Sequence, residues 1–269
     1  MEAGSTVQTE MTVVFAVLFF IAGAVTGSFS DCMAWRSVRG GGFWGRSACG
    51  LCGHRLGFTD LIPLAGYIVR RGRCRYCGGR IPLRHFLTEL LCAFIFTFCY
   101  LRLGIGIDLI RVLVLTSLLL PAALVDIDTK TVPNIYFILL FLIWICLVPF
   151  EPDKKTYLTG AALGGLLIPL IIWGISAVMS RLLGRMSLGG GDIKLLFSTG
   201  LYLGLGRSLV NIVLMCVIGL AYGIFSRDRD DGSFAFVPAI AAATLICHVF
   251  GGSLLALYFG LFDMEVSML

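Results

Sequence analysis

The amino-acid sequence predicts an all-α polytopic membrane protein with about eight transmembrane helices and a small zinc-binding cytoplasmic loop domain. Of its 269 residues, 58% are hydrophobic and only 14% are charged, whereas about 25% of the residues in a soluble domain are charged. Most of the apolar segments are long enough to cross about 30 Å of hydrocarbon as helices. The one sizeable polar segment carries two closely spaced pairs of cysteines. Together these observations exclude a soluble globular protein.

The expected spans follow one another along the whole chain. The first begins after "MEAGSTVQTE", which is acidic rather than basic, so we expect a retained membrane helix and not a cleaved signal peptide. The sixth is short and contains Gly200, Gly204 and Gly206, so its boundary with the seventh is the least defined. The expected spans cover residues 11–33, 86–104, 107–125, 134–150, 157–180, 193–206, 208–226 and 234–262.

The basic residues predict how the helices are oriented. Residues 34–85 contain ten arginines and one acidic residue, Asp60. Because Lys and Arg accumulate in cytoplasmic loops, we place this segment in the cytoplasm and the N-terminus outside. The net charge of +5 then indicates attraction to the anionic inner leaflet of a lipid bilayer, without nucleic acid as a partner. The expected domains are a first transmembrane helix (1–33), the cytoplasmic loop (34–85) and a transmembrane core (86–269).

Four cysteines in the loop form two C-x-x-C pairs with 21 residues between them, "CGLCGH" and "CRYCGG". This arrangement is typical of a tetrahedral zinc site, in which each pair closes a tight turn. Disulfides or a redox dithiol are the alternatives, and a reducing cytoplasm argues against stable disulfides. Four cysteine ligands leave no open position for water, so we expect a structural zinc. His54 and His85 could compete as ligands, and the four expected ligands are Cys49, Cys52, Cys74 and Cys77.

Carboxylates in or beside the apolar spans are the candidate functional residues, because burying an acid in a membrane costs free energy. Asp31 and Glu89 lie near the inner ends of the first two spans, where we expect pairing with Arg36 and Arg84. Asp108 lies at the outer surface, where a solvated helix start accounts for it.

Two other acids, Asp126 and Asp192, lie on the same side of the predicted bundle. Asp126 begins "DIDTKTVPN", in which Pro133 breaks the chain and Asn134 is the expected N-cap of the next span. Asp192 follows the three glycines of "GGGDIK", which would let a substrate backbone approach and would allow positive φ angles.

Two carboxyls that meet in this way share a proton, and they could then hydrolyse a peptide by acid–base catalysis. A cation site or a proton relay in a membrane transporter is an alternative from a different class. A third hypothesis is a non-catalytic assembly factor built on the zinc loop. The residues alone do not separate these three functions.

The combination of motifs resembles the type IV prepilin peptidase family of G-x-G-D aspartyl peptidases. The matching segments are "GSFSDCMAWR" (27–36), the four cysteines, "DLIP" (60–63), "RGRCRYCGGRIPLRHFLTELL" (71–91), "DIDTKTVPN" (126–134) and "GGGD" (189–192), in the family's order. One departure is Asp31, at a position where the family commonly has asparagine; another is "FAFVP" (234–238), where relatives often have P-F-G-P.

The resemblance implies a bifunctional enzyme of the bacterial inner membrane. Such an enzyme cleaves the leader peptide of type IV prepilins or pseudopilins after a glycine. It then methylates the new N-terminal residue with S-adenosylmethionine, and a peptidase without this second activity is the alternative.

Carried over by motif, Asp126 and Asp192 are the catalytic pair and the four cysteines bind zinc. Asp128 competes with Asp126, but the family's aspartate lies seven residues before the proline, which selects Asp126. Gly189 and Gly191 lie where we expect the substrate backbone to approach. Lys194 also fits the family, as a local charge partner of the site, and a positive-inside anchor is the alternative.

Overall fold

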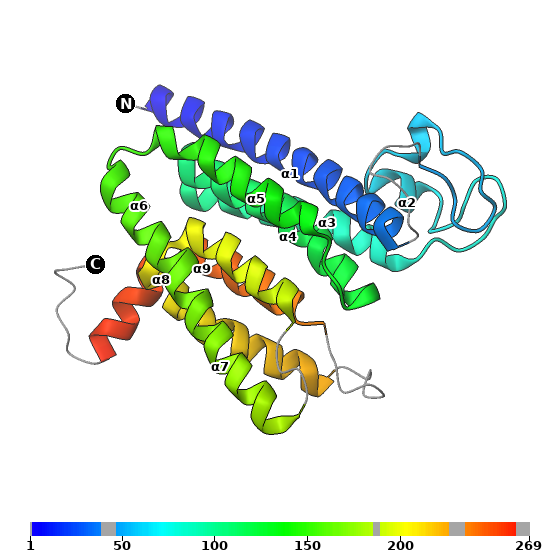
Figure 1. Ribbon diagram of the computed structural model, residues 1–269. Coiled ribbons are helices and arrows are strands. Elements are labelled where there is room, and N and C mark those ends of the chain that lie inside the picture. The colour runs from blue at the N-terminus through cyan, green and yellow to red at the C-terminus, as the bar shows by residue number, and fades with distance from the viewer. Residues whose placement is uncertain (1, 39–46, 185–188, 226–234, 262–269) are drawn as a thin grey trace. The chain divides into compact units, whose positions relative to one another are not determined.

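The structure is a computed structural model that describes residues 2–38, 47–184, 189–225 and 235–261 (Figure 1). These residues form helices and no β-strand, with two isolated β-bridges in the loop that carries the paired cysteines. The chain divides into two compact units, Met1–Leu109 and Ile110–Leu269.

The first unit contains two long helices and a loop domain between them. Helix α1 spans Glu2–Val38 and α3 spans Leu83–Leu103. The loop holds a 3-10 turn, η1 (Phe58–Asp60), and a short helix, α2 (Ala65–Val69). In Figure 1, α1 and α3 run alongside each other, and the loop lies at the end where α1 finishes and α3 begins.

Two glycines bring α1 and α3 unusually close together. A Cβ atom added at Gly23 would lie 2.6 Å from the carbonyl oxygen of Cys92, and one at Gly27 would lie 2.8 Å from that of Thr88. Small residues four apart let helix backbones approach in membranes, where packing replaces the hydrophobic effect as the driving force. Asp31 lies one turn beyond Gly27 on the same helical face, so the close packing directs it toward the start of α3.

The second unit is a bundle of apolar helices. Its elements are α4 (Ile107–Thr129, which begins at the boundary), α5 (Asn134–Leu147), η2 (Val148–Phe150), α6 (Lys154–Ala162), the π-helical segment η3 (Leu163–Leu167), α7 (Ile168–Leu183), α8 (Gly190–Phe225) and α9 (Val237–Leu261). Within the described ranges of the whole chain, six helices are long and apolar enough to cross a membrane, and α5 with η2 forms a shorter apolar helix. The chain is therefore a multi-pass membrane protein.

The two expected spans 193–206 and 208–226 both lie in α8, which is broken at Gly204. Gly204 has φ 70° and ψ −175°, outside the helical region and accessible to glycine without strain. A Cβ added at Gly164 in η3 would lie 2.6 Å from the carbonyl oxygen of Gly204, so the break also packs tightly against a neighbouring helix. Figure 1 shows the yellow and gold parts of α8 as separate helices that meet at this break. The break therefore lies inside the expected span 193–206, two residues before its predicted end.

Two expectations about the connection between α4 and α5 were wrong. Helix α4 continues to Thr129, one turn beyond the predicted end at residue 125. Asn134 is the first residue of α5 rather than its N-cap, which is Pro133. The extended Pro133 backbone leads directly into the helix, and the Asn134 side chain instead accepts a hydrogen bond from Lys194. The expected last span, 234–262, begins and ends in residues outside the described ranges.

Candidate active site and metal centre

Asp126 lies in the last turn of α4 and is buried, with 5% of its surface exposed. Its Oδ2 atom accepts a hydrogen bond of 2.9 Å from the backbone N–H of Val237, the first residue of α9. The first N–H groups of a helix have no partner within the helix and attract anions. The start of α9 therefore fixes the carboxyl group of Asp126. Asp128, two residues on, is exposed.

Asp192 lies in the first turn of α8, and its charge interacts with that of Asp126. Two contacts join this end of α8 to the chain that follows α4. The Nζ atom of Lys194 donates a hydrogen bond of 2.9 Å to Oδ1 of Asn134. A Cβ added at Gly191 would lie 3.9 Å from Cβ of Val132. These contacts place the start of α8, which carries Asp192, beside the chain that follows Asp126.

The glycines before Asp192 do not adopt the positive φ angles that we expected. None of Gly189, Gly190 and Gly191 is in the left-handed region. Gly190 and Gly191 are the first two residues of α8 and take its helical angles. These glycines instead leave space beside Asp192. A Cβ added at Gly190 would meet no described atom within 4 Å, and one at Gly189 would lie 3.1 Å from Oδ2 of Asp192. Side chains here would fill space next to a carboxyl group.

The four loop cysteines lie together in the first unit. Their Sγ atoms are all within 4.8 Å of one another, and Zn–S bonds of about 2.3 Å in a tetrahedron place sulfurs about 3.8 Å apart. The donor set, its spacing and its chemistry therefore fit a zinc ion held by four cysteines.

The two cysteine pairs have the same local structure. In the first, the N–H of Cys49 donates to the oxygen of His54 and the N–H of Gly53 donates to the oxygen of Cys49, both at 2.9 Å. In the second, Cys74 and Gly78 repeat this pattern 25 residues later at 2.8 and 3.0 Å. An isolated β-bridge closes each turn, Ala48–Arg55 in the first and Arg73–Arg80 in the second. We call these two turns the knuckles (residues 47–56 and 72–81).

Glycine is required at the same position of both knuckles. Gly53 and Gly78 occupy equivalent positions with φ of 69° and 68°, which other residues rarely adopt. The two histidines that could have competed as ligands have other partners: His54 stacks on Tyr76 with ring centroids 3.6 Å apart, and His85 contacts Asp31.

A cavity of about 400 Å³ lies between the knuckles and the facing ends of α1 and α3. Asp31 and Glu89 contribute carboxylates to its lining, and Trp35, Tyr67 and Phe86 contribute aromatic rings. This volume falls within the range of about 300–1,000 Å³ that small-molecule sites occupy.

The acids of this cavity have defined partners. Asp31 forms the expected ion pair with Arg84, with 3.5 Å between Nε and Oδ1, and also contacts His85. Glu89 accepts a hydrogen bond of 2.7 Å from the N–H of Leu64 and so ties the loop to α3.

Sequence reasoning did not identify the roles of Val237 and His85. Val237 contributes a backbone N–H, which leaves no trace in its residue type. His85 did carry a signal, because it lies four residues before Glu89 and therefore shares its helical face.

Comparison with known proteins agrees with the order of these sites. Residues 21–103 match the bacterial peptidase A24 N-terminal domain, and residues 113–224 match the type IV leader peptidase family. A prepilin leader peptidase/N-methyltransferase of Bacillus subtilis is 31% identical over 79% of this chain and 85% of its own length. Proteins with the same name from Neisseria gonorrhoeae and Dickeya chrysanthemi are 30% and 32% identical, over 73% and 78% of this chain and 68% and 76% of their own lengths. No solved structure gives a significant match. The chain belongs to the type IV leader peptidase family.

Proposed function

We propose that this protein cleaves the leader peptides of type IV prepilins or pseudopilins after a glycine and then methylates the new N-terminal residue. The observation that carries the peptidase half is the approach of Asp126 and Asp192 beside three glycines, in a chain whose relatives are named prepilin leader peptidase/N-methyltransferase.

Two carboxyls at close range share a proton, because both cannot ionise cheaply. The ionised carboxylate takes a proton from water as the water attacks the peptide carbonyl carbon. The protonated carboxyl donates to the carbonyl oxygen and stabilises the developing negative charge. The Val237 N–H holds Asp126 in one orientation throughout, and the Lys194–Asn134 hydrogen bond fixes the start of α8.

The glycines give the peptide room to reach the carboxyls. A substrate must bring its own backbone within hydrogen-bonding distance of Asp192, and the open space at Gly190 permits this. Gly189 and Gly191 act in the same way, since a side chain at either position would intrude beside Asp192 or Val132.

The methyl-transfer half uses the first unit. S-adenosylmethionine supplies an electrophilic methyl group on a sulfonium cation, and the carboxylates and aromatic rings of the 400 Å³ cavity suit such a cation. Zinc on Cys49, Cys52, Cys74 and Cys77 would fold the knuckles that form one wall, since four thiolates leave it no open ligand position.

We propose the orientation that the positive-inside rule predicts, with the N-terminus outside and the knuckles in the cytoplasm of a bacterial inner membrane. The substrate's basic leader and the ten arginines of residues 34–85 then repel each other. Docking of the substrate's apolar helix in the bilayer, rather than charge attraction, brings them together.

The test is mass spectrometry of a prepilin-like substrate incubated with the purified enzyme, with and without S-adenosylmethionine. Cleavage after the leader glycine should fall at least about 100-fold in Asp126→Asn and in Asp192→Asn, the usual scale for loss of acid–base catalysis. Asp128→Asn is the matched control, because Asp128 is exposed only two residues away, and it should cleave at close to the normal rate.

A product with the mass of one added methyl group, formed only with S-adenosylmethionine, would establish methyl transfer. Normal cleavage by both Asn variants would refute the assignment of the pair. Intact substrate with the unaltered enzyme, together with aspartate-dependent ion uptake into liposomes, would favour the transporter instead.

A further inference from the structure

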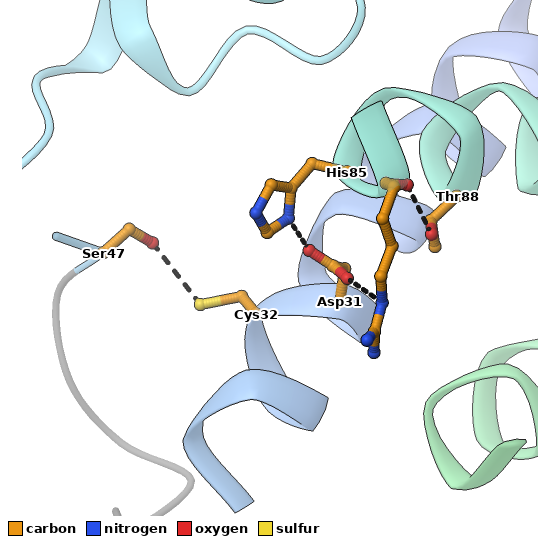
Figure 2. Close-up of polar contacts among 6 residues, drawn as sticks. Asp31, Cys32, Ser47, His85 and Thr88 are labelled. Atoms are coloured by element: carbon orange, nitrogen blue, oxygen red, sulfur yellow. Dashed lines mark hydrogen bonds and ion pairs between the residues drawn. The ribbon is translucent and has the colours of Figure 1, made fainter. Parts of the chain in front are cut away.

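An Asp–His pair lies at the cavity of the first unit, where the proposed peptidase chemistry has no use for it. Asp31 lies on the face of α1 that packs closely against α3 at Gly23 and Gly27. Its Oδ2 atom contacts Nδ1 of His85 (Figure 2). The Asp31 side chain is 7% exposed and the His85 side chain is 36% exposed. A buried carboxylate therefore orients an imidazole that remains accessible.

The other nitrogen of His85 is available to a ligand. Figure 2 shows the ring turned so that one nitrogen meets Asp31 while the other points away from it. Both Asp31 and His85 line the cavity, together with Cys32 and Ser47. With Nδ1–H donating to a carboxylate, Nε2 is the unprotonated nitrogen, which can accept a proton.

Charged side chains of both signs surround His85. Asp31 is in direct contact, and Glu89, one turn further along α3, interacts electrostatically with His85. Arg84 is the nearby cation, and its Nε lies 3.5 Å from Asp31. The other charged side chains that line the cavity are Arg36, Asp60, Arg70, Arg75 and Arg80.

We propose that this cavity is the methyl-transfer site and that Nε2 of His85, oriented by Asp31, accepts the proton of the substrate's new α-amino group. The proposal rests on the methyltransferase half of the proposed function. An α-amino group released by cleavage is mostly protonated near neutral pH, since its ordinary pKa is about 7.7–8.0. In that form its nitrogen has no lone pair with which to attack a methyl group.

In the proposed methyl transfer, His85 receives the proton that the substrate's ammonium group must lose. Nε2 takes a proton from the ammonium group, and the neutral nitrogen attacks the methyl carbon of S-adenosylmethionine. The N–C bond forms as the S–C bond breaks, and the bonding pair goes to sulfur, which leaves as a neutral thioether. His85 then returns its proton to solvent.

The aromatic residues of the same cavity would hold the donor. Trp35 lies one turn beyond Asp31 on α1, and Tyr67 and Phe86 pack on each other with ring centroids 5.2 Å apart. A sulfonium cation over an aromatic face gains electrostatic attraction. Binding and proton transfer therefore depend on different residues, which allows separate tests.

The first measurement is calorimetric binding of S-adenosylhomocysteine to the purified full-length enzyme. Trp35→Ala should weaken binding about tenfold, which corresponds to about 1.4 kcal/mol, whereas His85→Gln should change it only slightly. Unchanged affinity in Trp35→Ala would refute the assignment of the cavity.

The second measurement is methylation of a pre-cleaved substrate by His85→Gln at several pH values. Glutamine can still donate to Asp31 but cannot take up a proton, so the rate near pH 7 should fall about 100-fold. The defect should shrink near pH 9, where the substrate amine is already neutral. His248→Gln, at the histidine in α9 of the second unit, is the control and should methylate normally.

The outcomes separate this inference from the function on which it rests. A defect of equal size at pH 7 and pH 9, in enzyme that still binds S-adenosylhomocysteine, would make His85 structural and overturn the proposal. Normal methylation by His85→Gln would also overturn it while leaving the methyltransferase intact. If the unaltered enzyme neither bound S-adenosylhomocysteine nor methylated the substrate, the proposed methyltransferase function itself would be refuted.

Discussion

The two compact units hold their reactive side chains by different means. In Met1–Leu109, polar groups surround a cavity whose wall is a loop of short turns, four thiols and a few side-chain contacts. In Ile110–Leu269, two carboxyls lie at the ends of long apolar helices, and one of them is fixed by a backbone N–H. The first arrangement depends on four cysteines that fit a metal ion and on close helix packing, whereas the second depends on where helices begin and end. The two should therefore fail under different perturbations.

Loss of the metal should produce the largest difference between the two units, because only the first unit contains the four-cysteine cluster. Cys74→Ser, at the one buried cysteine of the four, should abolish the binding of about one zinc per chain, because a tetrahedral site needs all its ligands. Residues 47–81 should then become sensitive to protease, and methylation should be lost. Metal analysis and limited proteolysis of the purified variant measure both effects. Cys247→Ser, in α9, is the control, and equal zinc content in Cys74→Ser would contradict the assignment.

A clash between α1 and α3 should damage the first unit without metal loss. The Gly27→Leu substitution places a large side chain where even a Cβ would lie 2.8 Å from backbone atoms. Overpacking of this kind typically costs about 1–3 kcal/mol, and it moves Asp31 away from His85. Methylation should fall at least about tenfold while cleavage continues.

Gly106→Leu is the matched control for this clash, because a Cβ at Gly106 meets no described atom within 4 Å. If Gly27→Leu and Gly106→Leu methylate equally well, the close packing of the two helices is not what positions Asp31.

The second unit should be sensitive to the backbone hydrogen bond from Val237 to Asp126. Val237→Pro removes the N–H that Asp126 accepts, while proline is well tolerated at the first residue of a helix. Loss of a hydrogen bond to a charged group costs about 1.5–3 kcal/mol, so cleavage should fall about 10- to 100-fold in kcat/KM. Val237→Ala keeps the N–H and should lose much less; equal losses would show that the side chain matters instead.

The smallest effect should come from Asp153, outside the membrane-spanning segments. Its Oδ1 accepts the N–H of Thr156 at 3.2 Å and caps α6, and hydrogen bonds from Thr156 lower its pKa. A carboxyl with a lowered folded-state pKa stabilises the fold above its ordinary pKa, and that stability is lost as the pH falls through the lowered value. Asp153→Ala should therefore slightly reduce the thermal midpoint at pH 7 and leave it unchanged at strongly acidic pH. A reduction that is independent of pH would contradict this assignment.

Much of the fold could be predicted because it depends on local sequence. Apolar runs give the helices, and the paired cysteines give the knuckles. The glycines around residue 204 indicated a break in α8, and the structure places it at Gly204 itself.

The remaining features depend on contacts between distant residues. The register of α1 against α3 decides that Asp31 meets His85, and Val237 joins Asp126 through a main-chain group 111 residues away. Neither contact could be inferred from residue types, because hydrophobic periodicity identifies a helix but not the depth at which it meets its neighbour.

The break in α8 also sets how thick a layer the helix carrying Asp192 can cross. Residues 190–203 before the break number fourteen and reach only about 21 Å at 1.5 Å per residue, against about 30 Å of hydrocarbon. A short helix is matched by local thinning of the bilayer, which draws lipid headgroups and water toward its ends. In the proposed function, the carboxyl in its first turn would then lie near the water that hydrolysis consumes.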